Sequence, residues 1–213
     1  MLSNESEARA WLETLPEWDA AARERLEALT RLLREENTRQ NLVSAASLEQ
    51  VWLRHIADSA QLLVHAPRET SSPWLDLGTG AGFPGLVVSA LRPEIEVVMV
   101  ESRGRRVEWL KRVSETLSLS NAQVEGRALE TLATRPFCVI SARAFAPLPK
   151  LLALSARFST STTRWLLPKG QSARQELLDL TGRTHMFHVE QSLCDENAGV
   201  IVGTLAGTKG NKP

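Results

Sequence analysis

Residues 74–85 read WLDLGTGAGFPG and join a short apolar strand to a glycine-rich turn and then to a helix. Four of the eight residues from Gly78 to Gly85 are glycine. Glycine has no Cβ, so the backbone can turn sharply there and a ligand can lie against it. The N–H groups that begin the following helix point toward such a ligand. The segment therefore predicts a site for a nucleotide-like cofactor.

Composition indicates a single folded unit in a reducing compartment. The chain has 213 residues, of which 43% are hydrophobic, and a chain of this size buries roughly 70% of its unfolded surface without covalent staples. Cys138 and Cys194 lack C-x-x-C spacing, which favours free thiols. The first residues lack the basic and apolar regions of a signal peptide, so we expect none, and no run of apolar residues approaches about 18. We expect a cytoplasmic monomer with no membrane contact and no metal site.

The charge balance argues against a protein that coats nucleic acid. Twenty-five basic and 25 acidic residues give a formal net charge of zero, whereas such proteins bind phosphates through a large positive excess. Local basic clusters still occur, at residues 31–39 and 103–112. Each cluster fits a solvated helix face as well as a local contact with RNA.

Hydrophobic periodicity predicts helices first and then alternating strands and helices. Ala22, Leu26, Leu29 and Leu33 recur at helical spacing, and a second helix is expected from Ser47, which has capping-box spacing, through residue 63. Strands are expected at residues 74–77, 95–100, 122–125, 137–141 and 165–167, and helices at 85–91, 107–117, 149–158 and 172–180. Two further strand-like runs, 185–189 and 199–205, leave no room for a helix between them.

These elements predict an α/β fold of Rossmann-like type. Its sheet of seven strands is mostly parallel and ends in a C-terminal antiparallel hairpin, and helices cover both faces. We expect an N-terminal helical extension at residues 1–70, a core at 71–208 and a disordered tail at 209–213. Ligands of such sheets bind beyond the carboxyl ends of the strands, where residues 78–82, Glu101, Arg143 and Lys169 should meet.

The glycine pattern admits two cofactor classes. Residues 80–85 fit G-x-G-x-x-G, which indicates a nicotinamide or flavin dinucleotide. The longer pattern Asp76-x-Gly78-x-Gly80-x-Gly82 is the form that class I methyltransferases use for S-adenosylmethionine. That ligand has no pyrophosphate, and its ammonium group can be oriented by Asp76. Glu101 ends the second strand, where a carboxylate accepts hydrogen bonds from ribose hydroxyls in either class.

Motifs beyond this loop resemble the RsmG family, also called glucose-inhibited division protein B. The resemblance covers about residues 25–206 and rests on Asn41-Leu42, Arg54-His55-x-x-Asp58-Ser59, Gly82-Phe83-Pro84-Gly85, Arg127-Ala128-Leu129, Ser141-Ala142-Arg143-Ala144 and Pro168-Lys169-Gly170. It implies a class I methyltransferase that transfers a methyl group from S-adenosylmethionine to N7 of one guanine in 16S ribosomal RNA, with the RNA recognised within the 30S subunit or its precursor.

The resemblance also assigns site residues. Gly78, Phe83, Ala128, Leu129 and Arg143 map to cofactor contacts. With Asp76, Gly80 and Glu101 they complete the expected cofactor site. Ordinary core packing is the alternative for Phe83, and an ion pair with Arg103 or Arg105 is the alternative for Glu101.

Guanine N7 carries a lone pair and no proton, so its methylation needs no general base. We expect alignment of the reacting groups to dominate, with Arg143 as the catalytic residue between the two ligands. The alternative for Arg143 is an ion pair with Glu101 or Asp76. Any arginine or lysine in the pocket should bond guanine O6 or a phosphate, because a donor on N7 would occupy the reacting lone pair.

Expected RNA contacts lie on several elements: Asn41, Arg54, His55, Lys111 and Lys169. On the second helix, Asp58 stands three residues after His55 and four after Arg54, so it can reach either. This trio fits a structural clamp or an RNA-facing wall equally well. An oxidoreductase, or a non-catalytic RNA-binding assembly factor that keeps a cofactor pocket, remains an alternative function.

Overall fold

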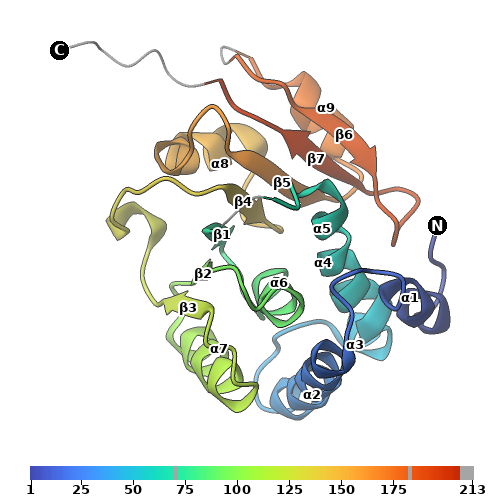
Figure 1. Ribbon diagram of the computed structural model, residues 1–213. Helices are drawn as coiled ribbons and strands as arrows, with labels where there is room; N and C mark the ends of the chain where they lie inside the picture. The colour runs from blue at the N-terminus through green and yellow to red at the C-terminus, as the bar shows by residue number, and fades with distance from the viewer. Residues whose placement is uncertain (70–71, 182–183, 207–213) are drawn as a thin grey trace.

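The computed structural model describes residues 1–69, 72–181 and 184–206. A seven-stranded sheet runs through its centre in the order β3-β2-β1-β4-β5-β7-β6 (Figure 1). The strands are β1 (Trp74–Leu77), β2 (Val97–Val100), β3 (Ala122–Glu125), β4 (Val139–Ala142), β5 (Arg164–Lys169), β6 (His188–Gln191) and β7 (Gly199–Gly203). The predicted Rossmann-like α/β class and the number of strands are confirmed.

Strand direction places the site. β1 pairs in parallel with β2 on one side and with β4 on the other, and β4 pairs in parallel with β5. β7 runs antiparallel to both β5 and β6, which confirms the predicted hairpin. After β1 the chain adds β2 and β3 on one side of β1, and it then returns to add β4 and β5 on the other side. The loops after β1 and β4 therefore meet at the switch point where open α/β sheets bind ligands.

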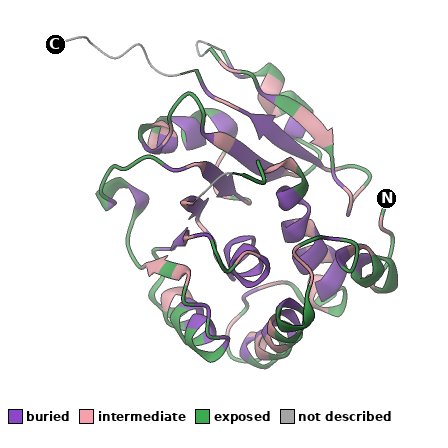
Figure 2. Ribbon diagram, viewed as in Figure 1, coloured by how far each residue is buried: buried purple, intermediate pink, exposed green. Residues whose placement is uncertain are grey.

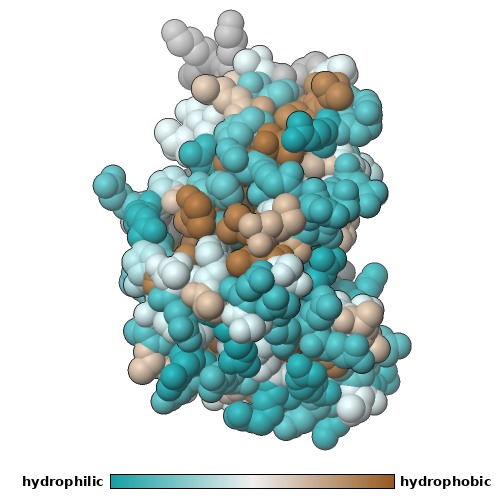
Figure 3. Space-filling view, turned by 90° about the vertical axis from the view of Figure 1, so that its right-hand side faces the viewer, coloured by the Kyte–Doolittle hydropathy of each residue, from teal (hydrophilic) through white to brown (hydrophobic). Residues whose placement is uncertain are grey.

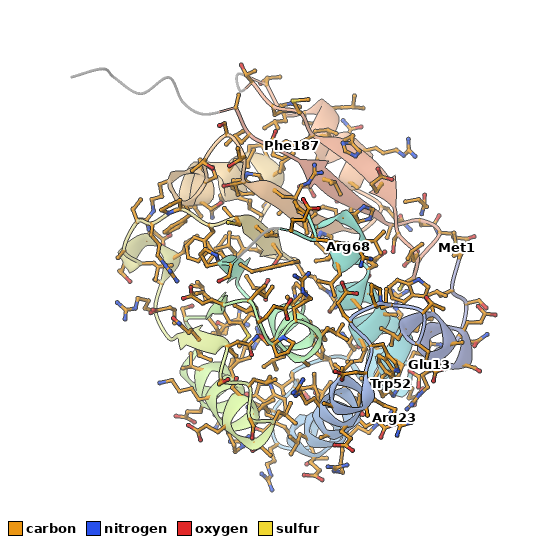
Figure 4. All side chains as sticks on the ribbon, in the orientation of Figure 1. Met1, Glu13, Arg23, Trp52, Arg68 and Phe187 are labelled. Atoms are coloured by element: carbon orange, nitrogen blue, oxygen red, sulfur yellow. The ribbon has the colours of Figure 1, made fainter. Side chains whose placement is uncertain are left out.

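Helices of the first third pack around Trp52. They are α1 (Glu5–Leu12), α2 (Ala20–Asn37), α3 (Ala45–Glu49), the π-helix η1 (Trp52–Ala57), α4 (Asp58–Ala60) and α5 (Leu62–His65). The apolar face predicted for α2 is buried. Trp52, labelled in Figure 4, is almost fully buried. The guanidinium carbon of Arg9 from α1 lies 3.8 Å from its ring centroid.

The expected continuous helix from Ser47 to residue 63 is wrong. Ser44 is the N-cap, since its hydroxyl accepts a hydrogen bond from the Ser47 N–H at 3.2 Å. The backbone N–H of Trp52 donates to the carboxylate of Glu5 at 2.6 Å. In a regular α-helix this N–H would donate to a carbonyl of the preceding turn. Because it donates to Glu5 instead, the regular helix is interrupted there, and the chain continues as a π-helix.

Side chains alternate between two cores on opposite faces of the sheet. The central strands β1, β2 and β4 are buried along their whole length (Figure 2). Trp74 and Met99 enter the core that contains the N-terminal helices, α6 (Gly85–Leu91) and α7 (Gly104–Thr116). Leu75 and Val98 enter the core that contains η2 (Leu129–Thr131), α8 (Leu148–Ser155), η3 (Ala156–Phe158) and α9 (Ala173–Leu178). The N-terminal helices thus share one core with the sheet. The predicted boundary after residue 70 and the tail at 209–213 fall on residues outside the described ranges.

The surface is largely polar. The face shown in Figure 3 is mainly hydrophilic, with small hydrophobic patches. The large apolar side chains that lie exposed within the described ranges are Met1, Val64, Leu178 and Met186. Across residues 1–69, 72–181 and 184–206, no helix combines the length and the hydropathy that a membrane crossing requires.

Candidate active site

Two cavities open at the carboxyl edge of the sheet. The smaller has a volume of about 250 Å³ and is lined by Gly78, Glu101 and Leu129 among others. The larger, of about 730 Å³, is lined by residues that include Arg54, His55, Asp58, Arg143 and Lys169. Ala144 and Phe145, directly after β4, line both cavities. Three expected cofactor residues thus gather at one cavity, and three expected RNA residues at the other.

The glycine loop has a backbone that other residues adopt with strain. Gly78 and Gly82 have φ values of +62° and +106°, and Gly80 has +61°. A Cβ on Gly82 would stand 2.2 Å from Cδ1 of Leu86, in the first turn of α6. The loop is therefore closed tightly against α6. The first N–H groups of this helix donate to Asp76, Gly82 and Pro84, so the prediction that they point toward a ligand is wrong. Gly80 is buried within this turn.

Asp76 is fully buried and holds the loop to the neighbouring strand. One carboxylate oxygen accepts a hydrogen bond from the Gly85 N–H at 2.9 Å, and the other accepts one from the Ser141 hydroxyl at 2.8 Å. Burial raises the pKa of Asp76 to about 6, against the opposing effect of these bonds. Its observed partners are thus protein groups, and the contact with a cofactor ammonium stays a prediction.

Glu101 is held in a fixed orientation in the smaller cavity. Its Oε1 accepts hydrogen bonds from the backbone N–H groups of Ser102 and Arg103, at 2.8 and 2.9 Å. Its Oε2 lies 3.8 Å from Nη1 of Arg106, so the ion-pair partner is Arg106 and not the Arg103 or Arg105 side chain. Ala128, exposed beside Leu129, lies at the start of η2. The carboxylate is buried yet lines the cavity, as a ribose acceptor must.

A polar network occupies the wall of the larger cavity. Nη1 of Arg143 lies 3.3 Å from Oδ2 of Asp58, and Nη2 lies 3.3 Å from Nδ1 of His55. Arginine only donates, so Nδ1 of His55 accepts and its proton is assigned to Nε2. The His55 ring stacks on Phe83, with centroids 4.9 Å apart. Phe83 is therefore packed in the core against the network, and its cofactor contact stays a prediction.

Electrostatics keep His55 neutral. Burial, followed by the positive charges of Arg143 and Arg54, lowers the pKa of His55 to about 3. Burial raises the pKa of Asp58, and Arg143 opposes that shift. Within the described residues, Nε2 of His55 and Nη1 of Arg143 are buried donors without a hydrogen-bond partner. Such donors cost free energy when no acceptor reaches them, so the hydrogen-bonding capacity of this network is satisfied only in part.

The predicted pairing within the second helix is wrong. Asp58 pairs with Arg143, and Arg54 pairs with Asp195 at 3.2 Å, from the turn between β6 and β7. The π-helix between Trp52 and Ala57 changes the angular spacing of these side chains. The ion-pair alternative for Arg143 is thus met by Asp58, rather than by Glu101 or Asp76.

The remaining predicted RNA residues are dispersed. Lys169 lines the larger cavity, but its ammonium donates to the Ala146 carbonyl at 2.8 Å and lies 2.8 Å from Oε2 of Glu176. Asn41 is exposed in the loop after α2, and Lys111 is exposed on α7 beside the start of β3. Neither lines the two cavities. Their contacts with RNA stay predictions.

Three residues at the site escaped sequence reasoning. Asp195 and Glu176 carry no local pattern, because each acts through a partner from another element. Phe145 had one signal, its place directly after the Ser141–Ala144 motif. The motif predicts where the strand ends, but it does not predict the direction of the Phe145 side chain.

Comparison with known proteins assigns the chain to a family. The family model described as "rRNA small subunit methyltransferase G" matches residues 22–198. The chain belongs to this family. It is 58% identical to the ribosomal RNA small subunit methyltransferase G of Erythrobacter litoralis over 95% of this chain and 97% of that protein. It is 54% identical to the protein of the same name from Novosphingobium aromaticivorans, over 100% and 93%.

Solved structures support the fold. A TehB-like SAM-dependent methyltransferase from Corynebacterium glutamicum matches with a TM-score of 0.51 at 16% identity, over 70% of this chain and 86% of that one. At this identity the likeness concerns the fold alone. The predicted family resemblance and the methyltransferase fold class are both confirmed.

Proposed function

We propose that this chain transfers a methyl group from S-adenosylmethionine to N7 of one guanine in 16S ribosomal RNA. The observation that carries the proposal is the pair of adjoining cavities at the switch point of the sheet, in a chain of the rRNA small subunit methyltransferase G family. The smaller cavity suits the adenosine side of the cofactor, and the larger cavity suits the nucleotide that receives the methyl group.

The residues of the smaller cavity fit the cofactor. Gly78 gives an approach without a Cβ, and the buried carboxylate of Glu101 can accept hydrogen bonds from ribose hydroxyls. Leu129 lines the same cavity as an apolar border for an adenine ring. Gly80, Phe83, Ala128 and Arg143 complete the proposed set, with Asp76 holding the loop from behind. When bound, S-adenosylmethionine supplies an electrophilic methyl group.

No proton needs to be removed from guanine N7, and the larger cavity agrees with that chemistry. Its histidine, His55, is neutral near pH 7 and has Nδ1 engaged by Arg143. The wall therefore offers donors rather than a free base. We assign Arg143 and His55 to acceptors other than N7, guanine O6 or a phosphate oxygen, so that the reacting lone pair stays free.

Catalysis then depends on position. Arg143 is fixed by Asp58 and His55, so it can hold the acceptor nucleotide without losing much side-chain freedom on binding. Correct alignment of reacting groups can supply up to about 7–11 kcal/mol in well-oriented systems. Arg54, His55, Asn41 and Lys111 are the proposed RNA contacts. Lys169, whose ammonium is bonded to Ala146 and Glu176, is instead proposed to stabilise the wall of the larger cavity.

A dinucleotide-dependent oxidoreductase is the weaker alternative. The full chain contains no tyrosine, which excludes a Tyr–Lys hydride-transfer pair. A non-catalytic assembly factor would keep both cavities but transfer nothing. We further propose that the protein acts in the cytoplasm as a monomer on the 30S subunit or its precursor, because zero net charge favours recognition of a preformed ribosomal surface.

The test is methyl transfer from labelled S-adenosylmethionine to isolated 30S particles and to naked 16S RNA. The expected product is N7-methylguanine, identified by nucleoside mass spectrometry, at one site. Calorimetry should show binding of S-adenosylmethionine and none of NADH. Label in RNA with a different modified nucleoside would reject the N7 assignment, and cofactor binding without label in either RNA would favour the assembly factor.

A further inference from the structure

Phe145 lies where the two cavities meet. Its side chain lines both of them, and it covers Gly78 directly. A Cβ placed on Gly78 would stand 2.4 Å from Cδ2 of Phe145 and 3.2 Å from Cε2. The aromatic ring thus occupies the side of Gly78 from which a ligand would approach. Phe145 and a cofactor resting on that side of Gly78 exclude each other.

The chain on either side of Phe145 is anchored. Before it, Arg143 is held by Asp58 and His55. After it, the Ala146 carbonyl accepts a hydrogen bond from Lys169, and the Leu148 N–H donates to Glu176 at 2.8 Å. Only two residues lie between these anchors.

The first of those two residues is in an uncommon conformation. Ala144 has a φ of +51°, in the left-handed region that residues with a Cβ rarely adopt. Such strain persists where the surroundings hold it, and it concentrates at functional sites. A change of backbone at Ala144 would relieve this strain and carry the Phe145 ring away from Gly78, with both anchors in place.

We propose that Phe145 is a positioning residue that alternates between the two cavities. In one position its ring covers Gly78, as the structure shows; S-adenosylmethionine displaces it, and the ring then forms an aromatic wall for the acceptor guanine in the larger cavity. This inference rests on the proposed function. It makes cofactor binding a step that prepares the acceptor site.

The composition of the larger cavity supports the second position of the ring. Among the residues that line it, Phe145 is the sole phenylalanine, and tyrosine and tryptophan do not occur there. The ring of His55 is already stacked on Phe83. An acceptor base needs a flat apolar surface in addition to hydrogen-bond donors, and aromatic side chains supply that surface for single bases.

Phe145→Ala tests both positions of the ring, the one over Gly78 and the one in the larger cavity. It should strengthen cofactor binding and weaken methyl transfer. Without the ring to displace, the Kd for S-adenosylmethionine, measured by calorimetry, should fall by roughly three- to tenfold. Without the aromatic wall, kcat/KM for RNA should fall by about 5- to 150-fold, the loss expected for one stacked base. A ring that served only as packing would weaken both.

Two matched variants complete the test. Phe145→Leu keeps an apolar side chain over Gly78 but has no aromatic face, so cofactor Kd should stay within about twofold of wild type while RNA methylation falls as in Phe145→Ala. Phe145→Tyr keeps both features and should preserve both measurements. Thermal unfolding of the three variants verifies that they are folded.

The outcomes distinguish this inference from the proposed function. A wild-type chain that bound no S-adenosylmethionine would overturn the proposed function and this inference with it. A wild-type chain that binds and methylates, together with a Phe145→Ala Kd that is unchanged or higher, would overturn the inference alone. The inference alone would also be overturned if Phe145→Leu methylated RNA with the same kcat/KM as Phe145→Tyr.

Discussion

Arg143 faces three groups at once: the carboxylate of Asp58, the ring of His55 and the larger cavity. Its side chain is 28% exposed, and that of Asp58 is 20% exposed. The pair is therefore screened only in part. Nη1 is paired with Asp58 and Nη2 lies beside Nδ1 of His55, so a contact with a substrate acceptor would use the remaining N–H groups of the guanidinium. Arg143 thus links β4 to the N-terminal helices, and we propose that it is a substrate donor as well.

Arg143→Ala should lower the rate of methyl transfer by about 100- to 1,000-fold, the usual effect of removing one preorganised donor. The matched control is Asp58→Asn, which removes the ion pair and keeps the arginine. A partly exposed pair contributes about 1 kcal/mol, so this variant should lose no more than about tenfold. Labelled methyl incorporation into 30S particles measures both. Full activity of Arg143→Ala would remove it from the mechanism.

His55 should weaken the fold in acid. Burial, with Arg143 and Arg54, lowers its pKa from 6.5 to about 3 in the folded protein. Below pH 6.5 the unfolded chain therefore binds a proton that the folded protein does not. The free energy of unfolding should fall by about 1.4 kcal/mol per pH unit from pH 6.5 toward 3. His55→Gln should remove this loss, as urea titrations at pH 7 and pH 5 can measure.

Asp76 should act in the opposite sense over much of the same range. Burial raises its pKa from 3.8 to about 6, so between these values the folded protein holds a proton that the unfolded chain releases. The stabilisation that this proton gives is present at low pH and is lost as pH rises through about 6. Asp76→Asn should therefore make unfolding more sensitive to acid between pH 6 and 4. A variant with the wild-type slope would contradict the assigned protonation.

At the scale of elements, the glycine loop and α6 form one unit. Gly82→Ala combines a φ of +106° with a Cβ 2.2 Å from Leu86, so the free energy of unfolding should fall by at least about 2 kcal/mol. Gly104 is the matched control, because an added Cβ meets nothing within 4 Å at the start of α7. Gly104→Ala should stabilise the protein by about 0.4–1 kcal/mol. Thermal or urea unfolding of both variants measures the difference.

Elements with a local signal were predictable from the sequence. α6 begins and ends at the predicted residues, because a buried apolar run decides it, and β3 does as well, because apolar and polar residues alternate along it. The π-helix was not, since it depends on a hydrogen bond from Trp52 to the distant Glu5. Tertiary contacts outweigh local propensity in such segments.

The same distinction applies to the site. Gly78, Glu101 and Leu129 meet at one cavity because parallel strands bring their carboxyl ends to one edge, a rule that needs only the order of elements. Which residues form ion pairs depends on the distances between segments that are far apart in the sequence. The pairs Arg143–Asp58, Arg54–Asp195 and Lys169–Glu176 join residues from different elements, and no spacing in the sequence indicates them.

At the scale of the whole molecule, internal pairing reduces the basic charge available to RNA. Glu36 of α2 lies 2.6 Å from Arg112 and 3.9 Å from Arg39, so one buried acid balances parts of both basic clusters. Arg106 is directed toward Glu101. Arg103 is exposed and lines the smaller cavity, and Arg105 is exposed nearby in the sequence but does not line it. A chain of zero net charge therefore depends on a few local cations for phosphate binding.

Lys111 and Lys169 differ in this respect, and the salt dependence of RNA binding can separate them. Lys111 is exposed and makes no ion pair within the described ranges, so Lys111→Ala should flatten the plot of log Kd against log salt concentration by about one unit. The ammonium of Lys169 is bonded to Ala146 and Glu176, and its side chain is 8% exposed. Lys169→Ala should therefore leave the slope unchanged and lower stability instead. A flatter slope for Lys169→Ala would mean that RNA displaces Glu176 and takes the lysine, which would restore the phosphate contact that the sequence predicts.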